Sequence, residues 1–114
     1  MERIVKQALL YDFYGELLTE HQKQIYEDVV LNDYSLSEIA EDRGITRQGV
    51  HDLIRRCDRA LEEYERKLGL VERFLCIKEL AEQIDSLLDR YEKTRDDSLS
   101  EQIRLLTARI REEL

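Results

Sequence analysis

The stretch Ser35–Cys57, SLSEIAEDRGITRQGVHDLIRRC, predicts two short helices joined by a tight turn. Ser35 is placed to cap the first helix, because Glu38 three residues later can reach back to its backbone N–H in a capping box. Gly44 can take the left-handed conformation that ends a helix, since it has no Cβ to clash. Thr46 is placed to cap the second helix. The stretch therefore predicts a helix-turn-helix, at about residues 35–57.

The second helix of this motif has an apolar face and a basic face. At three-to-four spacing, its inward side carries Val50, Leu53, Ile54 and Cys57. We expect nucleic-acid contacts from the motif's polar residues: Arg43, Thr46, Arg47, Gln48, His51, Arg55, Arg56 and Arg59. Arginine and glutamine are suited to base edges and phosphates, and the second helix of such a motif can lie in a major groove. The pattern predicts DNA binding; the alternative is a helical bundle whose arginines only solvate its surface.

We divide the expected contacts by position along the basic helix. Bases or phosphates are expected to be reached by Arg47, Gln48, His51 and Arg55, and the nucleic-acid backbone by Arg43, Arg56 and Arg59. The charge supports a local footprint, because residues 43–59 hold five arginines against two aspartates, a balance of +3, in a chain of net charge −8. The acidic remainder predicts weak, steeply salt-dependent affinity.

Length and composition indicate a small helical protein. The chain has 114 residues, no proline, four glycines and 39% charged residues, which is typical of long, solvated helices. No strand-like alternation is present, so we expect an all-α fold. No basic segment precedes an apolar run, and no run approaches the length that crosses a membrane. We therefore expect a soluble, cytoplasmic protein without membrane insertion.

A first helix is expected over residues 3–18. Its buried stripe is expected to be Val5, Leu9, Phe13 and Leu17, with Leu10, Tyr14 and Leu18 beside it. Tyr11 and Tyr14 fit two interpretations, a surface for a partner or core aromatics whose hydroxyls stay wet.

A second helix is expected over about residues 20–32, opened by a capping box of Thr19 and Gln22. Its buried residues are expected to be Ile25, Val29 and Val30. Asn32 and Asp33 favour a turn. We expect Tyr26 and Tyr34 to close the core of the helix-turn-helix.

The segment after Gly69 predicts a helical hairpin. From Leu70 to Tyr91 the apolar residues step by four and three alternately, a heptad pattern that indicates packing along a whole helix. A turn over residues 94–98, with a capping box of Ser98 and Glu101, and a last helix over about residues 99–113 complete the hairpin. We therefore divide the chain into a helix-turn-helix domain, residues 1–68, and a hairpin, residues 69–114.

The hairpin has more apolar surface than one partner helix can cover, which predicts an interface. We expect a homodimer, since symmetric dimers are the commonest oligomers. Its interface is expected to contain Phe74, Ile77, Ala81, Ile84, Leu88 and Tyr91. In the alternative, the hairpin folds back on its own domain and the protein is a monomer.

A family resemblance adds to these inferences. The segment Leu36–Leu61 resembles region four of bacterial sigma factors, with its pattern EIA, GITR, V and R. Taken with DFYGELLT at residues 12–19 and LEEYERKL at residues 61–68, the chain resembles the YlxM-like family of small bacterial cytosolic proteins over residues 9–91. It departs from that family at Arg43, where an apolar residue is usual, and at His51, where an aromatic residue is usual.

The resemblance implies a helix-turn-helix without a wing in a DNA-binding regulator. Genes of the family neighbour those of the signal recognition particle, which implies a role in that pathway or in its regulation. The alternative function is an interaction module that docks onto a protein or RNA component of the particle. RNA would then be recognised mainly by its shape and phosphates.

No group in the sequence indicates catalysis. The four glycines are isolated, so no phosphate-binding loop is formed. The two histidines and two cysteines lack metal-ligand spacing, and Cys57 and His51 lie on different faces of one helix. We expect no enzyme, no cofactor and no metal site. Cys57 and Cys76 are expected to be reduced residues on apolar helix faces.

Overall fold

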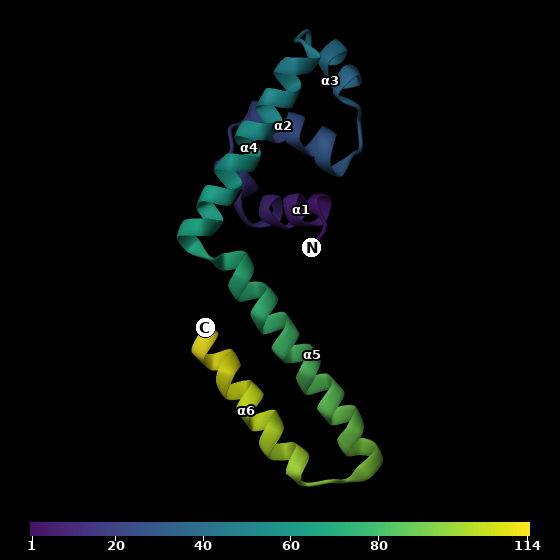
Figure 1. Cartoon of the computed structure of the whole chain (residues 1–114), viewed down its shortest axis with the longest axis vertical. Helices are drawn as coiled ribbons and strands as arrows, with labels where there is room; N and C mark the ends of the chain where they lie inside the picture. The colour runs from purple at the N-terminus through teal and green to yellow at the C-terminus, as the bar shows by residue number, and fades with distance from the viewer. The chain divides into compact units, whose positions relative to one another are not determined.

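The computed structural model describes residues 1–114, and helices are its only regular secondary structure (Figure 1). The helices are α1 (Arg3–Tyr14), α2 (Glu20–Tyr26), α3 (Leu36–Arg43), α4 (Arg47–Leu68), α5 (Leu70–Thr94) and α6 (Ser98–Glu113). A 3-10 turn, η1 (Gly15–Leu17), follows α1, and a π turn, η2 (Glu27–Leu31), follows α2. The chain divides into two compact units, Met1–Val71 and Glu72–Leu114. The predicted all-α fold with a helix-turn-helix is confirmed.

The helix-turn-helix is bounded by the residues that the sequence indicated. Ser35 Oγ accepts a hydrogen bond from the Glu38 backbone N–H at 3.1 Å, and the Glu38 carboxylate accepts one from the Ser35 N–H. Gly44 ends α3 with φ +67°, a conformation that favours glycine. Thr46 Oγ1 accepts from the Gly49 N–H at 2.9 Å. A Cβ on Gly49 would lie 3.1 Å from that same oxygen, so glycine leaves room for the cap.

The core of the first unit is built on α4. Its buried face consists of Val50, Ile54, Cys57 and Leu61, each at most 7% exposed. Helices α1, α2 and α3 all pack against this helix. Three of these four residues belong to the inward face that the spacing predicted, and Leu53 is half-buried beside them.

Helix α1 ends earlier than predicted, and its buried face is shifted to one side of the predicted stripe. The α-helix stops at Tyr14. The buried side chains here are Leu10, Tyr11, Tyr14 and Leu18, and all but Tyr11 were predicted beside the stripe. The two ends of the stripe, Val5 and Leu17, are wrong, since both side chains are at least half exposed. Tyrosine packs as an apolar residue only where its hydroxyl finds a partner.

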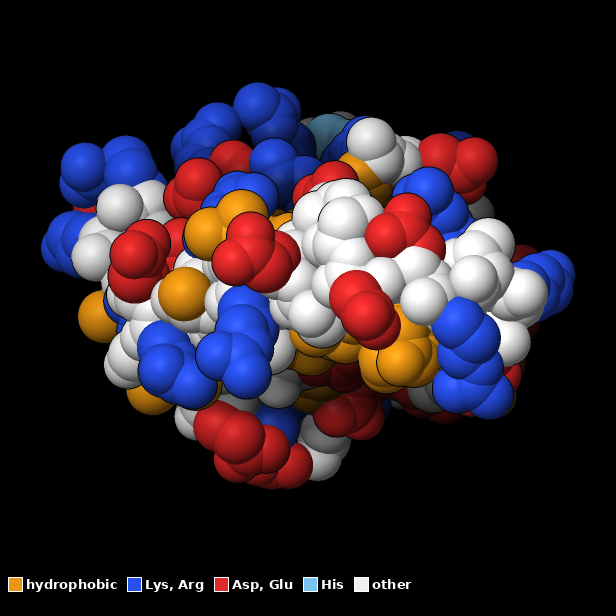
Figure 2. Space-filling view, turned by 90° about the horizontal axis from the view of Figure 1, so that it is seen from below, with side chains coloured by type: hydrophobic (Ala, Val, Ile, Leu, Met, Phe, Trp, Pro, Cys, Tyr) orange, Lys and Arg blue, Asp and Glu red, His pale blue; other side chains and the backbone are white.

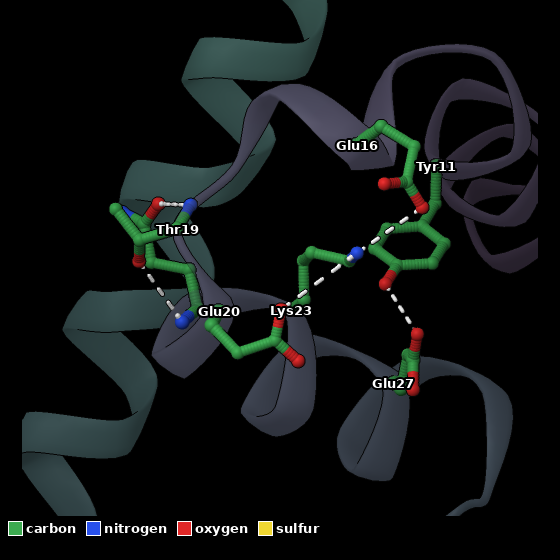
Figure 3. Close-up of polar contacts among 7 residues, drawn as sticks. Tyr11, Glu16, Thr19, Glu20, Lys23 and Glu27 are labelled. Carbon is green, nitrogen blue, oxygen red and sulfur yellow. Dashed lines mark hydrogen bonds and ion pairs between the residues drawn. The ribbon is translucent and has the colours of Figure 1, made fainter.

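Each tyrosine hydroxyl of this core donates to a carboxylate. Tyr11 reaches Glu27 Oε1 at 2.5 Å (Figure 3), and Tyr14 reaches Glu65 Oε1 at 2.6 Å. The ring of Tyr11 stacks on that of Tyr26, with 5.4 Å between the centroids. Burial, and then the hydrogen bond to the carboxylate, raises the pKa of Tyr11 and Tyr14. Of the two interpretations of these residues, the core is confirmed.

The second predicted helix contains a change of helix type. Helix α2 ends at Tyr26 and continues as the π turn η2, in which Val30 is buried. The capping box of Thr19 is present, and Figure 3 also shows Lys23 between the carboxylates of Glu16 and Glu20.

The prediction that Tyr34 closes the core is wrong, because its side chain is 50% exposed. Asp33 adopts a left-handed conformation, with φ +57°, directly before it. This turn reverses the chain before it enters α3, and Tyr34 stays outside. Tyr26, by contrast, is fully buried as predicted.

The second unit is an antiparallel hairpin of α5 and α6 (Figure 1). Ser98 is the first residue of α6 rather than its cap, so the predicted capping box with Glu101 is wrong. Instead, the Ser98 N–H donates to Asp96 Oδ1 at 3.0 Å. Hydrogen bonding from the Ser98 side chain, and then from this N–H, lowers the pKa of Asp96. No helix in the structure combines the length and apolar character needed to cross a membrane.

Asp58 links three helices of the first unit, and its loss should destabilise the protein. Its carboxylate accepts from the Tyr26 hydroxyl at 2.6 Å and from Gln7 Nε2 at 3.0 Å. We expect Asp58→Ala to lower the free energy of unfolding by about 2–3 kcal/mol, because the buried Tyr26 hydroxyl loses its acceptor. Urea unfolding followed by circular dichroism measures this. Asp52→Ala, on the exposed side of the same helix, is the control and should change the free energy of unfolding by less than about 0.5 kcal/mol. Equal losses in the two variants would contradict the role of Asp58 as a link between helices.

The two cysteines should differ in reactivity. Cys57 is fully buried, and burial raises its pKa to about 11, whereas Cys76 is half-buried. Because the thiolate is the reactive form, we expect a thiol reagent at pH 8 to modify only Cys76 in the folded protein. Both should react in urea. Rapid modification of Cys57 in a folded Cys76→Ser variant would show that the core around α4 is not closed.

Candidate nucleic-acid interface

Helix α4 carries four exposed arginines that have no ion-pair partner. The arginines exposed there are Arg47, Arg55, Arg56 and Arg59. None of the four guanidinium groups lies within ion-pair distance of a carboxylate, whereas Arg66 farther along α4 is paired with Glu63. From Arg47 to Arg59 the helix rises about 18 Å. We name these four residues the arginine face.

Hollows border the arginine face on both sides. A hollow of about 450 Å³ on the α3 side is lined by Leu36, Arg47, Gln48 and His51. Another, of about 430 Å³ on the α2 side, is lined by Thr19, His21, Gln22, Gly49, Asp52, Leu53 and Arg56. A shallower one of about 170 Å³ lies among Asp52, Arg55, Arg56 and Arg59. Six of the eight residues predicted to bind nucleic acid thus line hollows along α4.

One carboxylate interrupts this surface. Gln48 Nε2 donates to Asp52 Oδ1 at 2.9 Å, and His51 Nδ1 lies 3.9 Å from the same oxygen. The amide of Gln48 is therefore held along the helix, and it must leave Asp52 before it can donate to a base. Asp52 also places negative charge between Gln48 and Arg55, where a phosphate would be repelled.

The other two predicted residues occupy different positions. Arg43 Nη1 donates to Gln24 Oε1 at 3.0 Å, and its Nη2 lies 3.8 Å from Asp28 Oδ2. Its side chain is 27% exposed, and its Nε is buried without a hydrogen-bond partner. Arg43 thus ties the end of α3 to α2 and η2, which favours a structural role. Thr46 uses its hydroxyl as the cap of α4.

The structure adds His21 to this surface. Its side chain is exposed, and it lies on the α2 side of the arginine face, where it lines the same hollow as Arg56. Only the packing of α2 against α4 brings the two residues together, and no local sequence pattern reports that packing. His21 is therefore a further candidate for a phosphate contact.

No three metal-binding side chains among residues 1–114 lie close enough together to hold an ion. The surface around α4 consists of guanidinium, amide, imidazole and hydroxyl groups. Their common chemistry is hydrogen-bond donation to anionic or carbonyl oxygens.

Comparison with known proteins places the chain in a family. The profile of the UPF0122 family, described as "Putative helix-turn-helix protein, YlxM / p13 like", matches residues 1–102. The UPF0122 protein of Symbiobacterium thermophilum is 46% identical over 90 residues, which cover 79% of this chain and 84% of that protein. The UPF0122 protein of Streptococcus pneumoniae serotype 19F is 41% identical over 108 residues, 95% and 94% of the two chains. That of Thermoanaerobacter strain X514 is 50% identical over 80 residues, 70% and 66% of the two chains. The chain therefore belongs to the UPF0122 family of YlxM/p13-like helix-turn-helix proteins.

Proposed function

We propose that this protein binds duplex DNA through the arginine face and acts as a regulator. The observation that carries the proposal is the set of four guanidinium groups that are exposed on one side of α4 and unpaired. The major groove of B-DNA is about 12 Å wide. A face about 18 Å long can therefore reach into the groove and contact phosphates beside it.

The residues divide into two groups along α4. Arg47, Gln48 and His51 lie in the first two turns, which a helix-turn-helix offers to base edges. Arg55, Arg56 and Arg59 lie farther along and are suited to phosphates. In this arrangement the first group gives sequence preference and the second gives affinity.

The acidic balance of the chain limits how DNA can approach. Three basic residues face ten acidic ones in residues 1–42, so the surfaces of α1 and α2 repel a phosphate backbone. Only the arginine face attracts it. Non-specific affinity should be low and should fall steeply with salt.

A second candidate function rests on Asp52. Because this carboxylate holds the Gln48 amide, which would otherwise donate to a base edge, it favours a partner that is not read base by base. A protein or RNA component of the signal recognition particle would be such a partner, as the resemblance to YlxM-like proteins implies. A role in that pathway, like a cytoplasmic location, stays a prediction from the sequence.

We also propose that the two parts of the chain have different roles. Residues 1–68 would bind nucleic acid and residues 69–114 would join two copies as a homodimer. Two-fold symmetry would present two copies of α4 to a palindromic site.

Neutralising the arginine face should weaken DNA binding and its dependence on salt. We expect Arg55→Gln/Arg59→Gln to reduce the magnitude of the slope of log association constant against log salt concentration by about 2, because two phosphate contacts are lost. Fluorescence anisotropy with a random duplex at several salt concentrations measures this. The control Arg90→Gln/Arg109→Gln changes the net charge equally in the other unit and should keep the wild-type slope. Equal effects of the two double variants would mean that only net charge matters, and the proposed site would be wrong.

Sequence preference should depend on the start of α4. A preferred site is first selected from a random duplex library with the wild-type protein. We then compare the affinity for that site with the affinity for a scrambled duplex. We expect the ratio of the two affinities to be smaller for Arg47→Ala than for wild type, because the loss of a base contact costs about 1–3 kcal/mol of discrimination. If wild type binds a structured RNA hairpin more tightly than any selected duplex, the second candidate function replaces the first.

A further inference from the structure

The second unit has too small a core for its length. Of residues 72–114, only Leu80 and Leu99 are buried. Hydrophobic side chains remain open to solvent among charged ones, as Figure 2 shows for the face seen from below. Because isolated helices and single hairpins gain most of their stability from tertiary packing, such a unit is expected to be covered. What covers it follows from the difference between its two sides.

One side of the hairpin is hollow and rimmed by polar residues. A groove of about 710 Å³ runs there between α5 and α6, and its polar lining residues are Glu79, Glu82, Gln83, Ser86, Gln102 and Arg109. Leu87, Leu105 and Leu106 also line it, and Leu105 is 67% exposed. We name this side, after its charged and amide groups, the polar side.

The opposite side of the hairpin is apolar over both helices. The helical period places Ile77, Ala81, Ile84 and Leu88 of α5 there, next to Ile103 and Ile110 of α6. Ala81 is exposed, Leu88 is 44% exposed, and the four isoleucines are half-buried. We name these six residues the apolar side. It includes four of the six residues that the heptad predicted for a dimer interface.

The two edges of the apolar side carry opposite charges. Along the α5 edge lie Asp85, Asp89 and Glu92, with Lys78 at its far end, and along the α6 edge lie Arg104 and Arg111. All six side chains are exposed, and none forms an ion pair within the chain. The hairpin thus offers an apolar centre with one mainly acidic edge and one basic edge.

We propose that the apolar sides of two copies pack face to face as an antiparallel four-helix bundle, with α5 of each copy against α6 of the other. This rests on the homodimer of the proposed function and specifies its contacts. With a two-fold axis parallel to the helices, each helix is antiparallel to both of its neighbours. Because α6 runs back along α5 from the turn at residues 95–97, the partner's Arg104 comes level with Asp85 and Asp89.

Charge selects this pairing over the other symmetric one. If α5 packed against α5 of the second copy, Asp85 and Asp89 would face the same carboxylates, and Arg104 would face an arginine. Like charges across an interface are unfavourable, whereas the proposed pairing brings each acidic edge to a basic one. The same complementarity makes a second copy of this chain a better occupant than a uniformly charged partner.

The first test is the mass of the full-length protein in solution. We expect sedimentation equilibrium of wild type at micromolar concentration to give twice the chain mass of 13.6 kDa. Leu88→Glu and Ala81→Glu should give the monomer mass, because each places a carboxylate on the apolar side. Leu105→Glu is the matched control, since it adds the same charge on the polar side and should leave a dimer. A monomeric wild type, or equal behaviour of Leu88→Glu and Leu105→Glu, overturns the proposal.

The second test identifies the pairing. Asp85→Arg and Arg104→Asp should each weaken dimerisation by about tenfold or more, because each converts two symmetric attractions into repulsions. The combined variant Asp85→Arg/Arg104→Asp should return to within about threefold of wild type. If α5 instead packs against α5 of the second copy, Asp85→Arg removes a repulsion and does not weaken dimerisation, and the proposed pairing is wrong.

These outcomes are independent of the proposed binding to DNA. The mass and the dissociation constant need no nucleic acid, and Arg55→Gln/Arg59→Gln should dimerise like wild type. Dimerisation without any binding of duplex or RNA would overturn the proposed function and leave the bundle standing. Binding of DNA by a monomeric wild-type protein would overturn the bundle and leave the proposed binding of DNA standing.

Discussion

The carboxylate of Asp58 joins α1, α2 and α4, and the arrangement of the first unit depends on it. It accepts from the Tyr26 hydroxyl and from Gln7, and Arg3 lies 3.6 Å away. A buried hydroxyl without a partner would be costly, so α2 can bury Tyr26 only where this carboxylate meets it. The burial raises the pKa of Tyr26 and keeps the hydroxyl a donor. Glu27 and Glu65 do the same for Tyr11 and Tyr14, so three acidic side chains hold three aromatic ones in place.

Fixing one face of α4 determines what the other face can do. Val50, Ile54, Cys57 and Leu61 are buried against α1, α2 and α3. The side chains of the arginine face are then left to solvent: Arg55, Arg56 and Arg59 point away from the buried face, and Arg47 is exposed at the start of the helix. Its guanidinium groups have no carboxylate partners, so their hydrogen-bonding capacity is available to a ligand. Arg43 shows the contrast, since Gln24 and Asp28 hold it within the domain.

The second unit differs from the first in the size of its hydrophobic core. In the first unit, four helices and two turns converge on one core, whereas the hairpin has two helices and two buried side chains. In the proposed dimer the hairpin gains its stability from association, because the charges at its edges suit a second copy. The proposals thus assign binding and association to separate parts of the chain. Substitutions in one part can be tested without disturbing the other.

The sequence by itself determined which segments are helical and where the helix-turn-helix begins and turns, because caps and glycines act over three or four residues. The capping box of Ser35, the left-handed Gly44 and the cap of Thr46 all lie where local rules place them. The tertiary structure decided which side of the wide apolar stripe of α1 is buried, where Tyr34 lies and how Arg43 is used. Each depends on a partner far along the chain or on an unusual backbone turn: Glu65 for Tyr14, Gln24 and Asp28 for Arg43, Asp33 for Tyr34. Apolar periodicity could not choose that side, because a tyrosine enters a core only when a distant carboxylate accepts a hydrogen bond from its hydroxyl.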